Sequence, residues 1–277
     1  PSPNAPDLLV EARRTRLVRY DATGNVYAIV PEARSTARSP AAWAAVVCRD
    51  GTTDGVLLAI AAPPGAPYGV RVVNPDGSPA EVSGNGLRIF ARWLFDTGRV
   101  HAGVPFRVDT GARTVVCTVL EGGECVSVAM GTIDVTGPRT LRVGNGEVRA
   151  TIVNVGNPHA VALREGPMDE TAFRALGASL ERHPAFPQRT NVQTAWPDPG
   201  EAGVLHARIW ERGVGWTASS GSSACAVAAA FRATSVPADD ARATMSFLIR
   251  MPGGDVTVQL VGRTAWLEGP VESLSLR

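Results

Sequence analysis

Short runs of apolar residues, separated by turn residues, dominate the chain. Clear examples lie at residues 18–30, 45–50, 55–62, 69–77 and 107–120. Runs of this length that are bounded by Gly, Pro, Asn and Asp are typical of strands. We therefore predict a protein in which much of the chain is extended and paired into sheets.

Two segments have helical rather than strand periodicity. Residues 83–98 and 220–234 each begin with Ser-Gly and continue into apolar residues. In the first segment the apolar residues recur at helical spacing and Gly98 provides a stop, whereas the second is a long run of small residues suited to a buried helix. A further helix is predicted at 171–183.

The two predicted helices belong to an internal repeat. Gly-Asn before apolar residues, Ser-Gly at a helix start, and a Gly turn between apolar runs recur in the same order, about 130 to 140 residues apart. The pairs are Gly24-Asn25 with Gly156-Asn157, Ser83-Gly84 with Ser220-Gly221, and Gly111 with Gly253.

This repeat predicts two pseudo-symmetric halves, residues 1–135 and 136–277, with the last strand able to cross back to the first half. We expect an α+β fold in which each half is a strand-rich sheet or barrel wrapped on its central helix. A ligand cleft between the halves follows from this architecture.

Composition narrows the function classes. Hydrophobic residues make up 44% of the chain and charged residues 19%, and the formal net charge is +1. These values indicate an ordinary globular protein without a field that would attract nucleic acid or a membrane surface. No apolar run reaches the length of a membrane span, and residues 1–16 lack the apolar core of a secretory signal. The default expectation is therefore the cytoplasm.

Metal and cofactor motifs are also missing from the sequence. None of the four cysteines forms a CxxC pair or stands at ligand spacing from a histidine, and we expect small, reduced, buried side chains at Cys48, Cys117, Cys125 and Cys225. A phosphate loop, a dinucleotide fingerprint and an HExxH motif are absent. We predict neither a metal nor a cofactor.

The helix starts are the strongest candidates for chemistry. Gly84-Asn85 and Gly221-Ser222 place backbone N–H groups at a helix N-terminus, where the helix dipole favours an anion. A single start of this kind is usually an ordinary cap. Two such starts facing one cleft would hold one carboxylate and stabilise the charge that develops when its α-proton leaves.

Polar residues also interrupt the apolar strands. Arg212 can hold a carboxylate through two hydrogen bonds, and Glu211 can hold an ammonium group or tune a proton-transfer group. His159 is a candidate for a catalytic or supporting role. Taken singly, an Asn is usually a turn residue, an adjacent Glu-Arg a solvated face, and a lone His a core residue. The asparagines in question are Asn25, Asn74, Asn157 and Asn191.

Together these segments resemble diaminopimelate epimerase, within a wider group that includes proline racemase and phenazine-pathway isomerases. The motifs are ATGNVYAIV, VVNPDGSPAEVSGNGLRIFARWL, VGNPHAVAL, FPQRTNVQTAW, IWERGVGWTASSGSSACAVAAA, MPGGDVTV and LEGPVE, between about residues 17 and 270. The resemblance implies a cleft between two central helices, a place in lysine biosynthesis, and no pyridoxal phosphate or metal. One residue removes the α-proton, and another on the opposite face returns one.

The main departure from the family lies at the acid/base positions. The family has cysteines just before the two Gly-rich turns, where this chain has Ser83 and Ser220. A serine hydroxyl is far more basic than a thiol, so it needs a neighbouring base, and His159 or Glu211 is available for that part. Gly55 replaces a Gln of the pattern.

The wall of the site also differs, since Trp216 replaces a Glu of the pattern. The residues that the resemblance assigns to the ligand are retained. Those matching the holders of the distal, non-reacting end are Asn74, Asn157, Asn191, Glu211 and Arg212. Those matching the surroundings of the reacting carboxylate are Asn25, Gly84, Asn85, Gly221 and Ser222. Retention of both sets predicts a diaminopimelate-like ligand or another amino acid.

Three functions remain open at this point. The leading one is an isomerase that acts as an epimerase or racemase at an α-carbon through Ser83 and Ser220. A lyase, cyclase or dehydratase on the same scaffold needs no pair of symmetric thiols. A non-catalytic amino-acid-binding descendant, or an inactive form with both cysteines replaced, is the third, although further departures at Leu87, Ile89 and Ser223 favour a natural variant. A homodimer is the commonest oligomer of soluble proteins, but no residue here specifies one.

Overall fold

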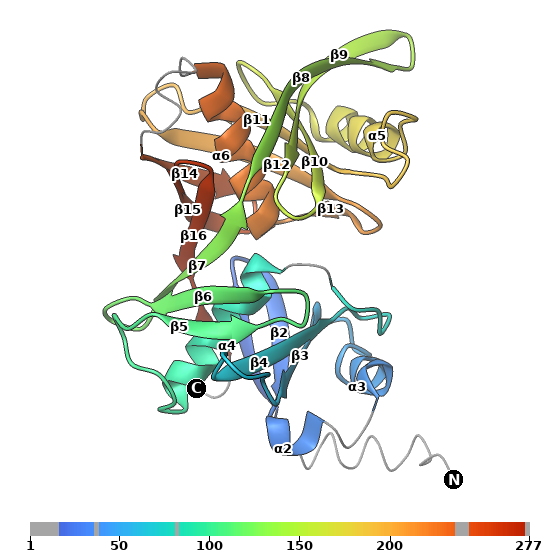
Figure 1. Ribbon diagram of the computed structural model, residues 1–277. Coiled ribbons are helices and arrows are strands. Elements are labelled where there is room, and N and C mark those ends of the chain that lie inside the picture. The colour runs from blue at the N-terminus through green and yellow to red at the C-terminus, as the bar shows by residue number, and fades with distance from the viewer. Residues whose placement is uncertain (1–16, 36–38, 81–82, 236–243, 275–277) are drawn as a thin grey trace. The chain divides into compact units, whose positions relative to one another are not determined.

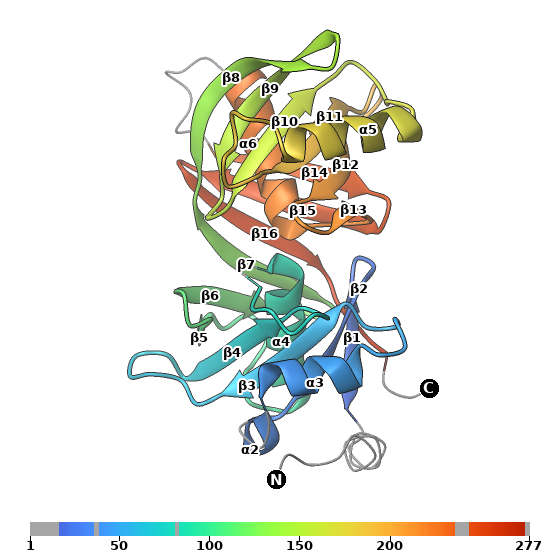
Figure 2. The ribbon, with the colours of Figure 1, turned by 90° about the vertical axis from the view of Figure 1, so that its right-hand side faces the viewer.

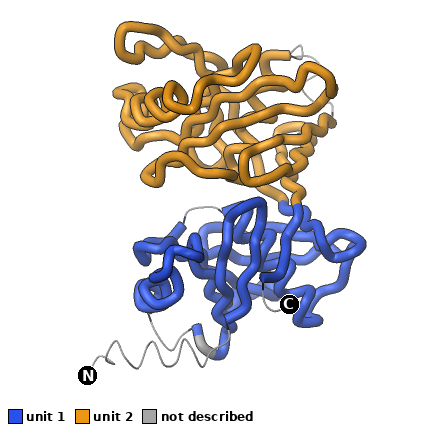
Figure 3. Tube along the Cα trace, turned by 180° about the vertical axis from the view of Figure 1, so that it is seen from behind, with its two compact units in different colours: residues 1–128, 270–277 blue, residues 129–269 orange. Residues whose placement is uncertain are grey.

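The computed structural model describes residues 17–35, 39–80, 83–235 and 244–274, so the segment 1–16 discussed above lies outside the described residues. The chain forms two compact units (Figure 3). The N-terminal unit comprises residues 1–128 and 270–277, and the C-terminal unit comprises residues 129–269. The chain leaves the first unit within strand β7 (Cys125–Thr132) and returns at the end of β16 (Thr264–Pro270).

The N-terminal unit is a curved set of strands packed around one long helix (Figure 1). Helix α4 (Gly84–Asp96) contacts β1, β2 and β6. Two shorter helices are α2 (Glu32–Ser35) and α3 (Pro40–Val47). The strands are β1 (Val18–Ala22), β2 (Asn25–Val30), β3 (Gly55–Ile60), β4 (Tyr68–Val73), β5 (Phe106–Asp109), β6 (Thr114–Val119), the start of β7, and β17 (Glu272–Ser273).

The C-terminal unit is built in the same way. Helix α6 (Gly221–Ser235) contacts strands on several sides, and α5 (Glu170–Glu181) packs on β11 and β12. The strands are β8 (Asp134–Val143), β9 (Gly146–Asn154), β10 (Pro158–Leu163), β11 (Asn191–Pro197), β12 (Val204–Glu211), β13 (Gly215–Thr217), β14 (Met245–Met251), β15 (Gly254–Val261) and β16.

Parallel and antiparallel strand pairs follow one another in the same order in both units. Starting from β1, successive pairs through β7 run antiparallel, parallel, antiparallel, parallel and antiparallel, then antiparallel again. In the C-terminal unit the successive pairs of β9, β10, β11, β12, β14, β15 and β16 have the same order of directions: antiparallel, parallel, antiparallel, parallel, antiparallel and antiparallel. The predicted α+β fold with two repeated, helix-centred halves is confirmed.

The central helices begin where the sequence predicts them. Helix α4 buries both its apolar stripe and its polar first turn. Every residue of α6 from Gly221 to Ala230 is buried, because its small side chains let strands approach it closely. Helix α5 matches the predicted helix at 171–183 and buries Leu176 and Leu180 against the sheet.

One predicted strand is wrong. Residues 45–50, expected to be extended, belong largely to helix α3 and the turn that follows it. Ser39 caps this helix by accepting a hydrogen bond from the Ala42 N–H at 3.3 Å, and Pro40 stands at its first position. A short apolar run cannot by itself distinguish a strand from a helix.

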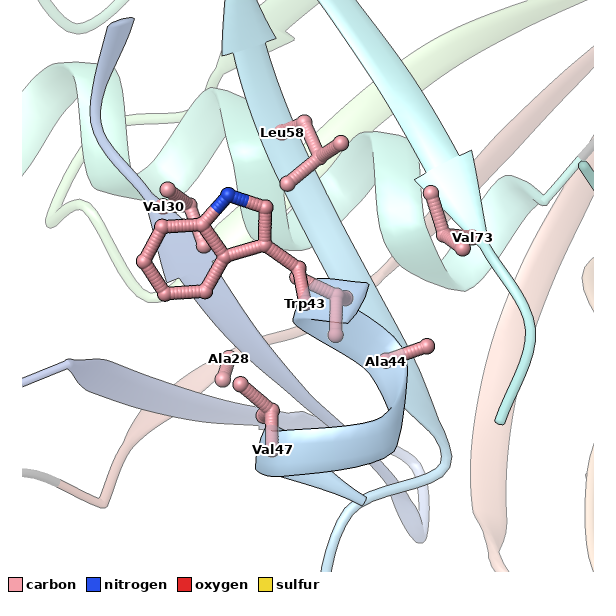
Figure 4. Close-up of a cluster of buried hydrophobic side chains, with 8 residues drawn as sticks. Ala28, Val30, Trp43, Ala44, Val47, Leu58 and Val73 are labelled. Atoms are coloured by element: carbon pink, nitrogen blue, oxygen red, sulfur yellow. The ribbon is translucent and has the colours of Figure 1, made fainter. Parts of the chain in front are cut away.

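Helix α3 covers one face of the sheet formed by β2, β3 and β4 (Figures 2 and 4). Trp43, Ala44 and Val47 point from the helix into a cluster with strand residues that include Val30 and Leu58. Helix α4 contacts β2, and most residues of β2 and β3 are buried. Among the described residues, no helix is both long enough and apolar enough to cross a bilayer.

Candidate active site

Ser83 lies at the N-terminus of the central helix of the N-terminal unit. Its Oγ accepts a hydrogen bond from the Gly86 N–H at 2.9 Å, so the serine is the N-cap of α4. A Cβ at Gly86 would lie 3.0 Å from this Oγ. Glycine at position 86 therefore leaves room for the Ser83 side chain to cap the helix.

A polar network lies beneath this helix start. Asn85 Nδ2 donates to Asn25 Oδ1, which brings together two of the predicted ligand residues. Arg88, fully buried one turn further along α4, donates to Asn85 Oδ1 at 2.7 Å and to Thr23 Oγ1 at 3.1 Å. The sequence analysis missed Arg88, although its position three residues after Asn85 places both side chains on one helix face.

Tyr27 adds a second hydroxyl close to Ser83. Its phenol oxygen lies 3.5 Å from Ser83 Oγ, and one hydroxyl donates to the other. Tyr27 is on β2 and is almost fully buried. It too was missed, because strand alternation gives no sign of which helix residue its hydroxyl reaches.

Asn74 has turn contacts in this structure. Its backbone N–H donates to the Ser78 carbonyl at 2.9 Å, and its Nδ2 donates to Ser78 Oγ at 3.0 Å. Asp76 Oδ1 also accepts from Ser78. These bonds fix the turn at 74–78, and the ligand-binding role of Asn74 stays a prediction.

In the C-terminal unit, Ser220 has the equivalent place before α6. Its carbonyl accepts the Ala224 N–H at 3.0 Å, which is the first bond of the helix. Ser220 is 6% exposed, and Gly221, Ser222 and Ser223 behind it are buried. Neither residues 84–87 nor residues 221–224 include an acidic side chain, so no carboxylate in either first turn offsets the partial positive charge of the helix start.

A buried chain of hydrogen bonds runs behind the start of α6. Gln193 Nε2 donates to Ser223 Oγ at 2.9 Å and to His159 Nδ1 at 3.1 Å. With Nδ1 accepting, the ring carries its proton on Nε2, which donates to Asn157 Oδ1 at 2.8 Å. Ser223, Gln193 and His159 are all completely buried.

The same surroundings keep the His159 ring uncharged. Burial lowers its pKa to about 3, and the positive charge of Arg212 acts in the same direction, whereas the hydrogen bond with Gln193 opposes them. Both ring nitrogens have protein partners, so the geometry suits a fixed neutral hydrogen-bonding group. The catalytic role assigned to His159 from the sequence stays a prediction.

Asn191 fixes the turn that carries Glu211 and Arg212. Its Oδ1 accepts the Arg212 N–H at 3.0 Å, and its Nδ2 donates to the Pro158 carbonyl at 2.9 Å. The Arg212 side chain donates to the Gln188 carbonyl at 3.1 Å. Asn191 thus joins β10, β11 and the turn after β12, and Glu211 and Arg212 are presented side by side and partly exposed.

A buried carboxylate that the sequence analysis missed supports this turn. Glu181, the last residue of α5, accepts from Trp210 Nε1 at 2.8 Å and from the Gly213 N–H at 2.9 Å. Burial alone would raise the pKa of Glu181, but these two bonds and the charge of Arg189 outweigh burial and lower it. The turn is therefore held by an ionised group.

Trp216 lies on β13 next to this turn. It pairs with Trp210 across the β12–β13 ladder, and the Arg174 guanidinium lies 5.0 Å from the centre of its ring. Arg174 is also bonded to Glu170 on the same helix. Trp216 thus belongs to the strand pair whose connecting turn carries Arg212, and its place in the wall of a ligand site stays a prediction.

The repeated halves match solved structures over most of the chain. A phenazine biosynthesis protein of the PhzF family from Bacillus anthracis aligns with a TM-score of 0.69 at 14% identity, covering 93% of this chain and 96% of that chain. A hydroxyproline epimerase from Agrobacterium vitis aligns with a TM-score of 0.63 at 16% identity, covering 94% of this chain and 92% of that one. The fold is thus the one shared by PhzF-type and epimerase-type proteins.

Sequence comparison narrows this class further. The model of the diaminopimelate epimerase family matches residues 151–273. A diaminopimelate epimerase 2 from a Nostoc species is 33% identical, with 88% of this chain and 88% of the relative covered. The chain belongs to the diaminopimelate epimerase family and thus to the isomerases.

Proposed function

We propose that the chain is a cofactor-independent isomerase that moves the α-proton of an amino acid, with Ser83 and Ser220 at the proton-transfer positions. The observation that carries the proposal is a serine at the start of the central helix in each of two units with the same order of strands. Moving a proton from one face of a carbon to the other calls for two groups of this kind.

The helix starts supply the electrostatic part of the reaction. An α-proton is acidic enough to leave only if the negative charge that spreads onto the carboxylate is stabilised. Backbone N–H groups at the starts of α4 and α6, with no acidic side chain in either first turn, favour that charge. No metal or electron-accepting cofactor is needed in this scheme.

The turn at residues 211–213 supplies recognition. The Arg212 guanidinium suits a carboxylate and the Glu211 carboxylate suits an ammonium group, so together they fit the distal end of a diamino-dicarboxylate. Asn191 and Glu181 hold this turn in place. Because the Nostoc relative is named a diaminopimelate epimerase, diaminopimelate or a close analogue is the first ligand to test.

The two serines differ from thiols in what they require of their surroundings. The pKa of a free serine hydroxyl is so high that almost no alkoxide forms near neutral pH. Each serine therefore needs a neighbouring base to take up its proton. In this proposal His159 is a positioning residue, since its neutral ring fixes Asn157 on one side and Gln193 on the other. Glu211 remains the candidate base on the side of Ser220.

The test is incorporation of deuterium at the α-carbon. Pure protein is incubated in deuterated water with diaminopimelate stereoisomers and a panel of amino acids, and the products are read by NMR and mass spectrometry. We expect exchange accompanied by stereochemical inversion; the inversion is lost in Ser83→Ala and in Ser220→Ala but kept in Ser179→Ala, where the serine is exposed on α5. Loss of water or ring closure would indicate a lyase or cyclase instead, and tight binding without conversion a binding protein.

A further inference from the structure

The surroundings of Ser83 contain a feature that the proposed function does not by itself explain. Tyr27 reaches from β2 to place its hydroxyl oxygen 3.5 Å from Ser83 Oγ. One lone pair of Ser83 Oγ is occupied by the Gly86 N–H at 2.9 Å. The serine's own proton and its second lone pair are therefore the groups that face Tyr27.

Gly55 makes room for the Tyr27 ring. The two residues are direct partners in the parallel pairing of β2 with β3. A Cβ at position 55 would lie 2.6 Å from Tyr27 Cε1, 3.1 Å from Tyr27 Cδ1 and 2.7 Å from the Val73 carbonyl oxygen. Gly55 does not have a positive φ, so space rather than backbone conformation explains the glycine.

We infer that Tyr27 is a positioning residue that acts through Ser83 as its proton-relay partner, and that Gly55 is the residue that admits it. The inference rests on the proposed function of Ser83. When the substrate C–H bond breaks, its electron pair stays on the substrate and the proton forms the new O–H bond of Ser83. In those molecules whose Tyr27 phenol has already given its proton to water, the original Ser83 proton passes to the Tyr27 oxygen; an un-ionised Tyr27 instead donates its hydroxyl toward position 83. The reverse sequence returns a proton to the carbon.

This partner resolves the difficulty of a serine at an acid/base position. A phenol has an ordinary pKa of about 10, whereas an alcohol is far more basic, so the phenol is the better holder of the negative charge. The titratable or charged side chains on the elements around Tyr27 are Arg19, Tyr20 and Asp21 on β1, Asp54 before β3, and Arg88, Arg92 and Asp96 on α4. Of these, Tyr20 donates to Asp96, and Asp54 accepts the Val26 N–H.

The first arm of the test measures α-hydrogen exchange. Tyr27→Phe removes only the hydroxyl, and we expect exchange to fall by about 100-fold or more with little change in KM. Tyr20→Phe is the matched control, because it removes a buried hydroxyl that bonds to Asp96 at 2.8 Å on the last turn of α4. If the wild type exchanges and Tyr27→Phe exchanges equally fast, the inference is wrong.

The second arm needs no substrate and so separates the inference from the proposed function. Ser83→Cys places a thiol at the start of α4, and its pKa is measured from the pH dependence of alkylation. Mass spectrometry of the peptide containing residue 83 distinguishes it from the four native cysteines. Below pH ~10, the ordinary pKa of a phenol, Tyr27 is a neutral donor that stabilises the thiolate and lowers the pKa of the thiol, so adding Tyr27→Phe is expected to raise the thiol pKa by about half a unit or more.

The two arms give distinct outcomes. If no amino acid exchanges with the wild type, the proposed function fails, and the thiol measurement alone decides whether Tyr27 is coupled to position 83. An unchanged thiol pKa and alkylation rate on adding Tyr27→Phe would overturn the inference. A raised pKa with Tyr27→Phe but not with Tyr20→Phe would support it.

Discussion

The Nδ1 atom of His159 lies 3.1 Å from the Nε2 atom of Gln193, and both side chains are completely buried. This contact sets which ring nitrogen carries the proton, because the amide donates and Nδ1 accepts. It also places His159 inside a chain of hydrogen bonds that runs from Ser223, in the first turn of α6, through Gln193 and His159 to Asn157. Hydrogen bonds thus connect the first turn of α6, in the candidate site, to buried side chains of the C-terminal unit.

The neutral His159 ring makes stability depend on pH. Its pKa is lowered to about 3 in the folded chain, chiefly by burial, from an ordinary value of about 6.5. The part of the unfolding free energy that depends on a neutral His159 ring is therefore fully present above pH ~6.5 and is lost as the pH falls toward 3. We expect urea unfolding to show a smaller loss between pH 7 and pH 4 in His159→Asn than in the wild type. His101→Asn, at an exposed histidine, should leave that loss unchanged.

The Ser223 hydroxyl is expected to matter through Gln193. Ser223→Ala deprives a buried amide of one of its two acceptors, which should lower the free energy of unfolding by about 1 to 2 kcal/mol. Ser179→Ala deletes an exposed hydroxyl on α5 that bonds only to its own helix, so it should change stability by less than about 0.5 kcal/mol. Equal effects of the two changes would show that the Gln193–Ser223 bond contributes nothing.

Glu181 is expected to link α5 to the turn that carries Arg212. Glu181→Gln replaces one carboxylate oxygen with an NH2 group facing a donor, either Trp210 Nε1 or the Gly213 N–H. The expected cost is about 2 kcal/mol of unfolding free energy, together with a raised KM. Glu170→Gln breaks an exposed pair with Arg174 and should cost less than about 0.5 kcal/mol.

The Glu181 effect should also depend on pH in a defined direction. The folded-state pKa of Glu181 is lowered, so its contribution is present above the ordinary pKa of about 4.3 and is lost as the pH falls below that value. The stability difference between Glu181→Gln and the wild type should therefore shrink on acidification. A difference that grows below pH 4 would contradict this account of the turn.

Gly55 provides a test of packing around Tyr27. Gly55→Ala places a methyl group 2.6 Å from a Tyr27 ring atom and 2.7 Å from a backbone oxygen that cannot move freely. We expect a loss of about 1 to 3 kcal/mol in unfolding free energy. Gly146→Ala is the matched change in a strand, since the nearest atom there is 3.9 Å away and its φ is not positive. A stable Gly55→Ala variant with wild-type exchange would show that the ring position is not needed.

Sequence reasoning reached the features that are local or repeated. The two helix starts follow from Ser-Gly followed by apolar residues, and the duplication follows from motifs in the same order, so the repeated, helix-centred architecture was predictable in outline. The prediction of a strand at 45–50 was wrong because its short apolar run is compatible with the periodicity of a helix as well as that of a strand. The N-cap at Ser39 and the proline at position 40 were the signals that favoured a helix.

The supporting residues of the site were beyond such reasoning. Tyr27 and Ser83 are 56 residues apart in the chain, and Gln193 and Ser223 are 30 apart. Nothing in strand alternation indicates which distant hydroxyl a buried side chain will meet. Only departures from the family pattern, such as glycine at 55 and serine at 223, pointed to these places, and they identified neither partner.

The central claim is that each serine transfers a proton on its own side of one carbon. The most direct measurement is deuterium exchange from each separate stereoisomer of the substrate, in Ser83→Ala and in Ser220→Ala. We predict that neither variant inverts the carbon and that each exchanges only one stereoisomer, the two variants retaining opposite ones. The account would be contradicted if either variant inverted the carbon, or if either variant still exchanged both stereoisomers.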